Sequence, residues 1–344
     1  MRFILIFFIL IFFQSCSFDK KSGIWKYESD ASTKQKDTLK GFKSISVETK
    51  KFEKIVNFDN NFNIILDKQI SNSNWTEKFY KKNNNLVNFK FNNSYQIFLR
   101  SKKISNKKIS DNLLFHNKNV ITSDNKGNIL ILSIKENKIY SKFNFYKKKY
   151  KKIKKNLNLI IENNLIFVSD NIGYLYCLNY TQNKVIWAKN YKIPFRSNLK
   201  VYNNKLIAAD QNNNLYFFDK RNGEIISKIP TEEKIVKNNF INNISVNDKF
   251  TFFLNTSGVL YAIENKSLVV QWFLDLNQKI DSNLSNLFSG GKVISFKDKI
   301  IVHSNNFTHV LNSNNGSMYF KKNFIPKVAP IANNNFLFLI SEKN

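Results

Sequence analysis

The sequence predicts an all-β fold, a single β-propeller of about seven to eight four-stranded blades. From about residue 110 onward, the chain repeats a unit of short apolar strands separated by polar turns. Equivalent turn residues recur roughly every 40 to 50 positions, which is a typical blade period. The apolar runs are continuous, as in Leu175–Leu178, and this is typical of sheets that are covered on both faces. The recurring turn residues are Asp124, Asp170, Asp210, Asn255 and Asn305.

The N-terminus predicts export. An unbroken apolar run, Phe3–Phe13, precedes Ser15 and Cys16. Its length fits the core of a signal peptide and is too short to span a bilayer, which takes about 20 residues. The pattern resembles a bacterial lipoprotein signal, which implies removal of residues 1–15 and a lipid on Cys16. The alternative is an ordinary cleaved signal peptide with a stray cysteine. Ser17, where inner-membrane lipoproteins often carry Asp, makes the resemblance favour the outer membrane.

The rest of the chain divides into a tether and the propeller. Residues 16–50 are polar, charged and without period, which predicts a flexible tether. The propeller is expected over residues 51–344. Its first part repeats more faintly, with plausible strands at Phe62–Lys68 and Leu86–Phe91. Phe336–Asn344 looks like the first half of another unit, so either N-terminal strands complete that last blade or the sequence is shorter than its relatives.

Composition argues against a nucleic-acid partner despite a net charge of +29. Lys, Asn, Ile and Phe are over-used together, and all have A/T-rich codons, so genome bias accounts for the charge. Export also separates the chain from DNA. The one basic cluster, Lys147–Lys155, is either a solvated loop or a contact for anionic headgroups or an acidic partner. Only two cysteines occur, so no disulfide framework is expected, and Cys177 is predicted to be a buried apolar residue.

One repeat carries the pattern Asp-x-x-Gly-x-Leu-Tyr-x-Leu-Asn followed by Trp, which resembles the blade motif of pyrroloquinoline-quinone (PQQ)-like propellers. Trp187 and Trp272 close their units and are expected to plug the gap to the next blade. Ser73-Asn74-Trp75 resembles the start of the first blade. With the lipoprotein signal, the chain resembles the BamB family of outer-membrane protein assembly factors. The residues that match the pattern are Asp170, Gly173, Leu175, Tyr176, Leu178, Asn179 and Trp187.

This resemblance implies a non-catalytic scaffold lipoprotein without a cofactor, on the periplasmic face of the outer membrane. Its implied partners are a BamA-like barrel-assembly protein and unfolded outer-membrane proteins. The loop Ile193–Ser197 resembles the segment through which the family contacts the barrel protein, which implies Phe195 and Arg196 as anchors. The alternative is that Phe195 packs on the next blade. The family's acidic contact has no clear counterpart, since Asn238 and Asn239 stand about there.

The rival interpretation is a quinone-dependent dehydrogenase. Such an enzyme needs a carboxylate and amide metal site, a catalytic Asp and often adjacent cysteines, whereas the carboxylates here fall mostly in turns. The three histidines, His116, His303 and His309, include no pair at the helical spacing of metal ligands. No nucleophile motif or phosphate loop occurs. The sequence thus predicts neither enzyme activity nor a metal. A third possibility is an envelope propeller lipoprotein that binds another partner, such as a polysaccharide.

Overall fold

The chain divides into two units, Met1–Ser46 and Val47–Asn344, and every described residue belongs to the second. The expected signal peptide (1–15), tether (16–50) and lipid-carrying Cys16 therefore lie outside the described residues. Within the described part, no helix has the length and apolar character needed to cross a bilayer. The structure is a computed structural model that describes residues 63–91, 97, 99–233, 240–277, 288–334 and 336–341.

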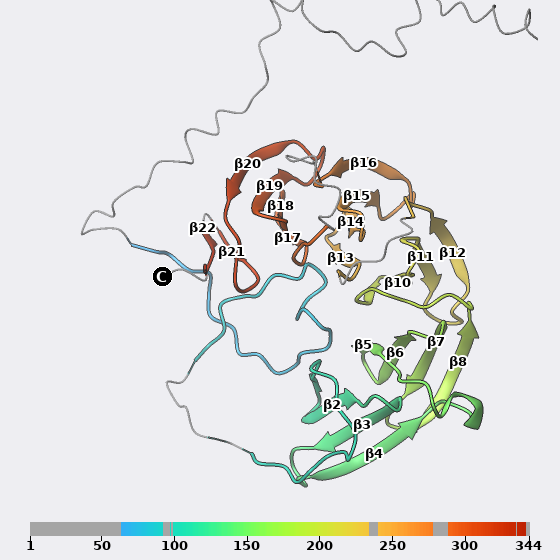
Figure 1. The fold of residues 1–344 in the computed structure, drawn as a ribbon. Coiled ribbons are helices and arrows are strands. Elements are labelled where there is room, and N and C mark those ends of the chain that lie inside the picture. The colour runs from blue at the N-terminus through green and yellow to red at the C-terminus, as the bar shows by residue number, and fades with distance from the viewer. Residues whose placement is uncertain are drawn as a thin grey trace, which may run out of the picture. The chain divides into compact units, whose positions relative to one another are not determined.

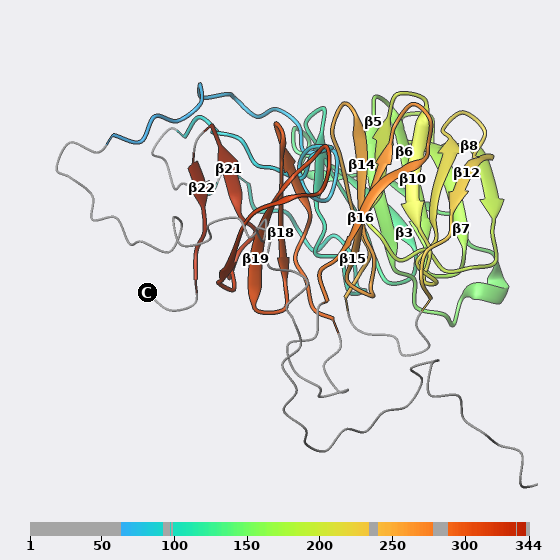
Figure 2. The same ribbon diagram turned by 90° about the horizontal axis from the view of Figure 1, so that it is seen from above.

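The regular structure is a series of antiparallel β-meanders. The described residues form five sheets of four strands and a sixth of two strands, and neighbours in each sheet are consecutive in the chain. Figure 1 shows the sheets following one another in chain order, and Figure 2 shows the same strands in a view turned by 90°. The strands are β1 (Leu114–His116), β2 (Asn119–Ser123), β3 (Asn128–Ser133), β4 (Lys138–Asn144), β5 (Leu157–Glu162), β6 (Leu165–Asp170), β7 (Tyr174–Asn179), β8 (Lys184–Asn190), β9 (Lys200–Tyr202), β10 (Lys205–Ala209), β11 (Leu215–Asp219), β12 (Ile225–Ile229), β13 (Asn243–Val246), β14 (Phe250–Leu254), β15 (Val259–Glu264), β16 (Val270–Asp275), β17 (Ile294–Phe296), β18 (Lys299–Ser304), β19 (Phe307–Asn312), β20 (Met318–Asn323), β21 (Ile331–Asn333) and β22 (Phe336–Phe338).

Apolar side chains join each sheet to the next. Val168 of β6 packs in a cluster with Leu114 of the preceding sheet, and its neighbour Phe167 packs in a cluster with Leu206 of the following sheet. Further clusters join the later sheets in the same way. Because successive residues of a strand point to opposite faces, a strand between two sheets must be apolar at every position. The continuous runs thus predicted stacked blades correctly.

The propeller class is confirmed, and the described residues contain six sheets where about seven to eight were expected. The difference lies before β1. There the described residues form isolated bridges, such as Ile70 with Phe89, and no paired strands, including at the two faint repeats near residues 65 and 88. The described part holds one short helical element, the 3₁₀ turn η2 (Lys148–Tyr150), in the basic cluster between β4 and β5.

Each four-stranded sheet carries a bulge at the same place in its outer strand pair. In β8, Trp187 pairs with Cys177 and Val185 pairs with Leu178, which leaves Ile186 as the extra residue. A bulge bends an edge strand and interrupts its hydrogen-bonding pattern, so it hinders pairing with another chain. The outer strands of these sheets are therefore poor templates for added strands.

The two predicted tryptophan plugs lie between sheets, as expected. The indole N–H of Trp187 donates to the Lys220 carbonyl of the next sheet at 3.0 Å. Its ring covers Gly223, where an added Cβ would come within 2.5 Å of the ring. Trp272 covers Gly316 in the same manner, at 2.7 Å from an added Cβ. Glycine at these two positions is thus required by the close approach of an indole from the preceding blade.

The recurring Asp closes the turn between the second and third strands. Oδ1 of Asp170 accepts the backbone N–H groups of Ile172, Gly173 and Tyr174, each at 2.8 Å. Asn255 closes the equivalent turn of a later sheet with its amide oxygen. Burial raises the pKa of Asp170, and the hydrogen bonds oppose that rise. The turn needs an acceptor oxygen rather than a charge, which explains why Asn can replace Asp.

Candidate functional site

Residues 75–85, here called the axial segment, lie among the first strands of the sheets (Figure 1). Trp75 pairs with Phe115 of β1, where the two N–H···O distances are 2.7 and 2.8 Å. The carbonyl of Thr76 accepts the N–H of Ile161 in β5 at 2.8 Å. The segment thus begins by bridging the innermost strands of the first two sheets.

The axial segment then contacts the later sheets in chain order. The carbonyl of Lys82 accepts a backbone N–H of β13 at 2.8 Å, and that of Asn83 accepts the N–H of Ser295 in β17 at 3.0 Å. Asn85 exchanges two hydrogen bonds with the backbone of Ala332 in β21, at 2.7 and 3.0 Å. With the β9 contact described next, the segment is bonded to the first strand of every sheet in the described part.

A buried ion pair fixes the middle of the axial segment. The ammonium of Lys200, in β9, donates to the Glu77 carboxylate and, at 2.9 Å, to the Lys81 carbonyl. Lys200 is 0% exposed and Glu77 9% exposed. Burial lowers the pKa of Lys200, while the Glu77 charge acts to raise it. Both charges are thus withdrawn from water, and the loss of either one would leave the other buried without a counter-charge.

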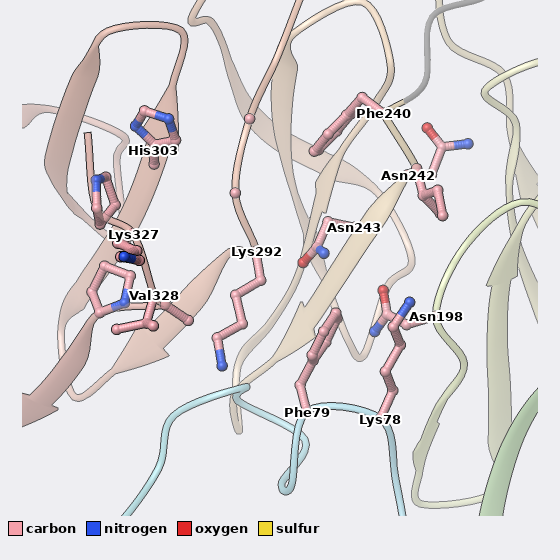
Figure 3. A pocket seen from close by; sticks show the side chains of 16 residues that line it. Lys78, Phe79, Asn198, Phe240, Asn242, Asn243, Lys292, His303, Lys327 and Val328 are labelled. Atoms are coloured by element: carbon pink, nitrogen blue, oxygen red, sulfur yellow. The ribbon is translucent and has the colours of Figure 1, made fainter. Parts of the chain in front are cut away.

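A cavity of about 490 Å³, here called the basic pocket, lies beside the axial segment (Figure 3). Three lysines and a histidine line it, together with apolar side chains from three loops, and no lining residue carries a carboxylate. A volume of this size is within the range of small-molecule sites. The lining residues are Lys78, Phe79, Asn198, Phe240, Ile241, Asn242, Asn243, Gly290, Gly291, Lys292, His303, Pro326, Lys327, Val328, Ala329 and Pro330.

The positive charge of the basic pocket is concentrated around one aromatic ring. The ammonium groups of Lys78 and Lys292 lie 5.3 and 5.4 Å from the centroid of the Phe79 ring. Burial lowers the pKa of Lys78. Burial and then the Lys200 charge lower the pKa of Lys292 to about 8. Because the nearby Glu77 is paired with Lys200, the pocket keeps surplus positive charge.

The two anchors expected in the loop Ile193–Ser197 differ in exposure. Phe195 is 4% exposed and packs against Tyr191 and Phe218, with ring centroids 6.0 and 6.1 Å away. Phe195 therefore packs on the next blade, which was the alternative to an exposed anchor. Its ring is withdrawn from the surface because the loop is bonded to β10. Arg196 is half-buried, and its N–H donates to the carbonyl of β10's last residue at 2.9 Å.

The other residues singled out in the sequence have structural partners. Cys177 is buried and free, as predicted, and burial raises its pKa to about 12. His116 Nδ1 lies 2.8 Å from the Tyr180 hydroxyl, and His309 Nε2 lies 2.7 Å from the Ser304 hydroxyl. The described residues hold no group of three or more His, Cys, Asp or Glu placed to bind a metal.

Most of the basic cluster Lys147–Lys155 is the solvated loop that was one of its two interpretations, and the contact with anionic headgroups or an acidic partner stays a prediction. Its middle lysines are exposed, whereas Lys155 is buried and donates its ammonium to the Tyr150 carbonyl. Asn238 and Asn239, which stand where the family has its acidic contact, lie outside the described residues. The cluster thus carries one structural lysine at the end of a solvated loop.

The axial segment and the basic pocket were not found from the sequence. Lys78, Lys200 and Lys292 are far apart in the chain, and lysine is so common here that no single one is distinctive. Lys200 alone offered a signal, because it stands at the start of a short inner strand where an apolar residue is usual. Such a buried lysine requires a carboxylate partner, but the sequence does not say which.

Comparisons with known proteins find similarity in fold and none in sequence. No family model matches the sequence, and no curated protein matches it. The structure is similar to that of BamB from Moraxella catarrhalis, with a TM-score of 0.52 and 10% identity over 65% of this chain and 66% of that chain. The chain thus matches just under two thirds of that BamB chain. A computationally designed protein, Ika8, matches with a TM-score of 0.51 and 10% identity over 67% of each chain. These likenesses establish the β-propeller fold.

Proposed function

We propose that this protein is a non-catalytic scaffold of the machinery that assembles outer-membrane β-barrels. The observation that carries the proposal is a propeller similar in fold to BamB, in a chain that starts with a short apolar run ending before Cys16. A lipid on Cys16 would hold the propeller at the periplasmic face of the outer membrane. Its partners would be a BamA-like barrel-assembly protein and unfolded outer-membrane proteins.

The use of the recurring carboxylates supports a scaffold over a dehydrogenase. Within their own turns, the carboxylate of Asp170 accepts three backbone N–H groups and that of Asp210 accepts two. Their second oxygens accept hydroxyl groups, from Tyr146 and Tyr216 respectively. Carboxylates used in this way hold the blade together and are not arranged as a general acid and base around a cavity. The repeat therefore supplies rigidity, which a docking platform requires.

Arg196 is the residue through which we propose that the Ile193–Ser197 loop contacts the barrel protein. The loop is held from both sides: its Phe195 N–H donates to the Asp170 carbonyl, and its Pro194 carbonyl accepts the Gln211 N–H, each at 2.9 Å. Asp170 and Gln211 belong to the turns of two adjacent sheets. A loop fixed in this way loses little conformational entropy on binding. Arg is also enriched among residues that dominate interface energies.

Arg196→Ala is expected to weaken capture of the barrel-assembly protein about 30-fold, which corresponds to about 2 kcal/mol. The propeller should stay folded, since the backbone contacts of the loop remain. Arg221→Ala is the matched control, because that guanidinium is exposed and pairs with Asp219 in its own turn. Affinity can be measured by biolayer interferometry on purified proteins. Equal affinities for wild type and the Arg196 variant would remove this loop from the interface.

Cys16→Ala is expected to abolish lipid attachment. The variant should then appear in the soluble periplasmic fraction or remain uncleaved in the inner membrane, whereas the wild type should fractionate with the outer membrane. Metabolic labelling with a palmitate analogue measures the lipid directly. Cys177→Ala is the control, since that thiol is buried in a sheet. Undiminished labelling of the Cys16 variant would contradict the proposed anchor.

A further inference from the structure

We propose that the basic pocket binds a small organic carboxylate, that is, a carboxylate attached to an apolar body. The proposal is independent of the scaffold function. It concerns the cavity lined by Lys78, Phe79, Phe240 and Lys292, which none of the contacts discussed for the barrel protein involves.

Charge is the first argument. Lys78 and Lys292 direct their ammonium groups to the same aromatic ring, Phe79, and both are partly desolvated. The described residues provide no ion pair for either of them. Burying a cation without a counter-charge is costly. Among the described residues, these two lysines share an aromatic ring but contact no carboxylate, and the charge of Lys200 acts on Lys292 as well. An anion between them would relieve both the desolvation cost and the mutual repulsion.

The apolar part of the lining is the second argument. The side chains of Phe79, Phe240 and Val328 line the cavity beside the lysines (Figure 3). Ile241 is a further apolar lining residue. A bare inorganic anion would leave this surface in contact with water. A ligand with an apolar body would cover it, and burial of each CH₂ group is worth about 0.8 kcal/mol. The combination of cationic and apolar groups therefore fits an amphipathic anion better than free phosphate.

Preorganisation is the third argument. Lys78 and Phe79 stand between two anchored points of the axial segment, the Thr76 carbonyl bonded to β5 and the Lys81 carbonyl bonded to Lys200. Lys292 comes from a different segment and is adjacent to Val293, which is fully buried. The cavity therefore exists before the ligand arrives, and little binding energy is lost to ordering it.

The test measures binding of 3-phenylpropionate to the full-length protein by isothermal titration calorimetry. Its neutral isostere 3-phenylpropionamide and the carboxylate acetate are the comparison ligands. We expect 3-phenylpropionate to bind at least about tenfold more tightly than either. Equal binding of the amide would overturn the role of charge, and equal binding of acetate would overturn the role of the apolar wall. No binding of 3-phenylpropionate at millimolar concentration would overturn the proposal as a whole.

Lys292→Met and Lys78→Met are each expected to weaken 3-phenylpropionate binding about tenfold. Methionine keeps the apolar volume of the lysine stem, and in Lys292→Met it removes a charge repelled by Lys200, so that variant should fold at least as stably as the wild type. Lys184→Met is the matched control, because Lys184 is exposed at the start of β8. Thermal unfolding checks the fold of each variant. Unchanged affinity in both pocket variants, with the fold intact, would contradict the site.

The pH dependence offers a second measurement on the unaltered protein. Since the pKa of Lys292 is about 8 in the ligand-free protein, its charge is largely present at pH 7 and largely lost at pH 9. Affinity for 3-phenylpropionate should therefore fall between these values, while any binding of the amide should not change. An affinity that is constant or rises over this interval would contradict the role of Lys292. The other charged and titratable groups around the pocket are Glu77, Lys78, Lys200, His303 and Lys327.

Discussion

Lys200→Met is expected to lower the free energy of unfolding by about 3–5 kcal/mol, because it leaves the Glu77 carboxylate buried without a cation. Lys200 is fully buried, and the Glu77 carboxylate that it contacts belongs to a residue that is 9% exposed. The axial segment would lose its link to β9, including the bond to the Lys81 carbonyl. Urea unfolding monitored by circular dichroism measures the loss.

The double variant Glu77→Leu with Lys200→Met provides the control for that prediction. Replacing both members of a buried ion pair by apolar residues is often neutral, whereas removing one member is costly. The double variant should therefore be more stable than Lys200→Met alone. If the two single changes simply add in the double variant, the ion pair does not couple the axial segment to β9 as described.

Trp187→Ala is expected to lower the free energy of unfolding by about 3 kcal/mol. The indole fills the space between two sheets, donates its N–H to the Lys220 carbonyl and covers Gly223. Gly223→Ala should be destabilising for a separate reason, because Gly223 has a φ of 75° and an added Cβ would meet the indole at 2.5 Å.

Combining the two changes separates packing from backbone strain. Trp187→Ala removes the ring that an added Cβ at position 223 would meet, so only the strain of the positive φ remains. The double variant should therefore lose less stability than the sum of the two single variants, and urea unfolding measures each value. Additive losses would show that the indole and the glycine do not meet as the structure places them.

The sequence predicted the features that recur along the chain. Continuous apolar runs and Asp or Asn turns occur several times and closing tryptophans occur twice, so the common role of each can be recognised without the structure. The packing of Val168 and Phe167 into clusters on opposite faces and the plug formed by Trp187 agree with this prediction. The fold could be predicted because these features repeat.

Features that occur once were not predictable in the same way. The axial segment has no repeat, and its partners are the Lys200 side chain in β9 and backbone groups from the five other sheets, which come together only in the folded chain. Phe195 illustrates the limit within a motif: resemblance implied an exposed anchor, and only the fold shows that its ring packs between Tyr191 and Phe218. Exposure of a loop residue depends on tertiary contacts that local sequence does not specify.

The most direct test of the scaffold proposal is co-purification of the full-length protein from detergent-solubilised outer membranes at its natural level. The proposal predicts that the barrel-assembly protein is recovered with the wild type and is reduced with Arg196→Ala but not with Arg221→Ala. The same preparation should show no quinone-dependent alcohol oxidation. Recovery of the propeller without the barrel protein, or quinone-dependent oxidation by the purified chain, would contradict the proposed function.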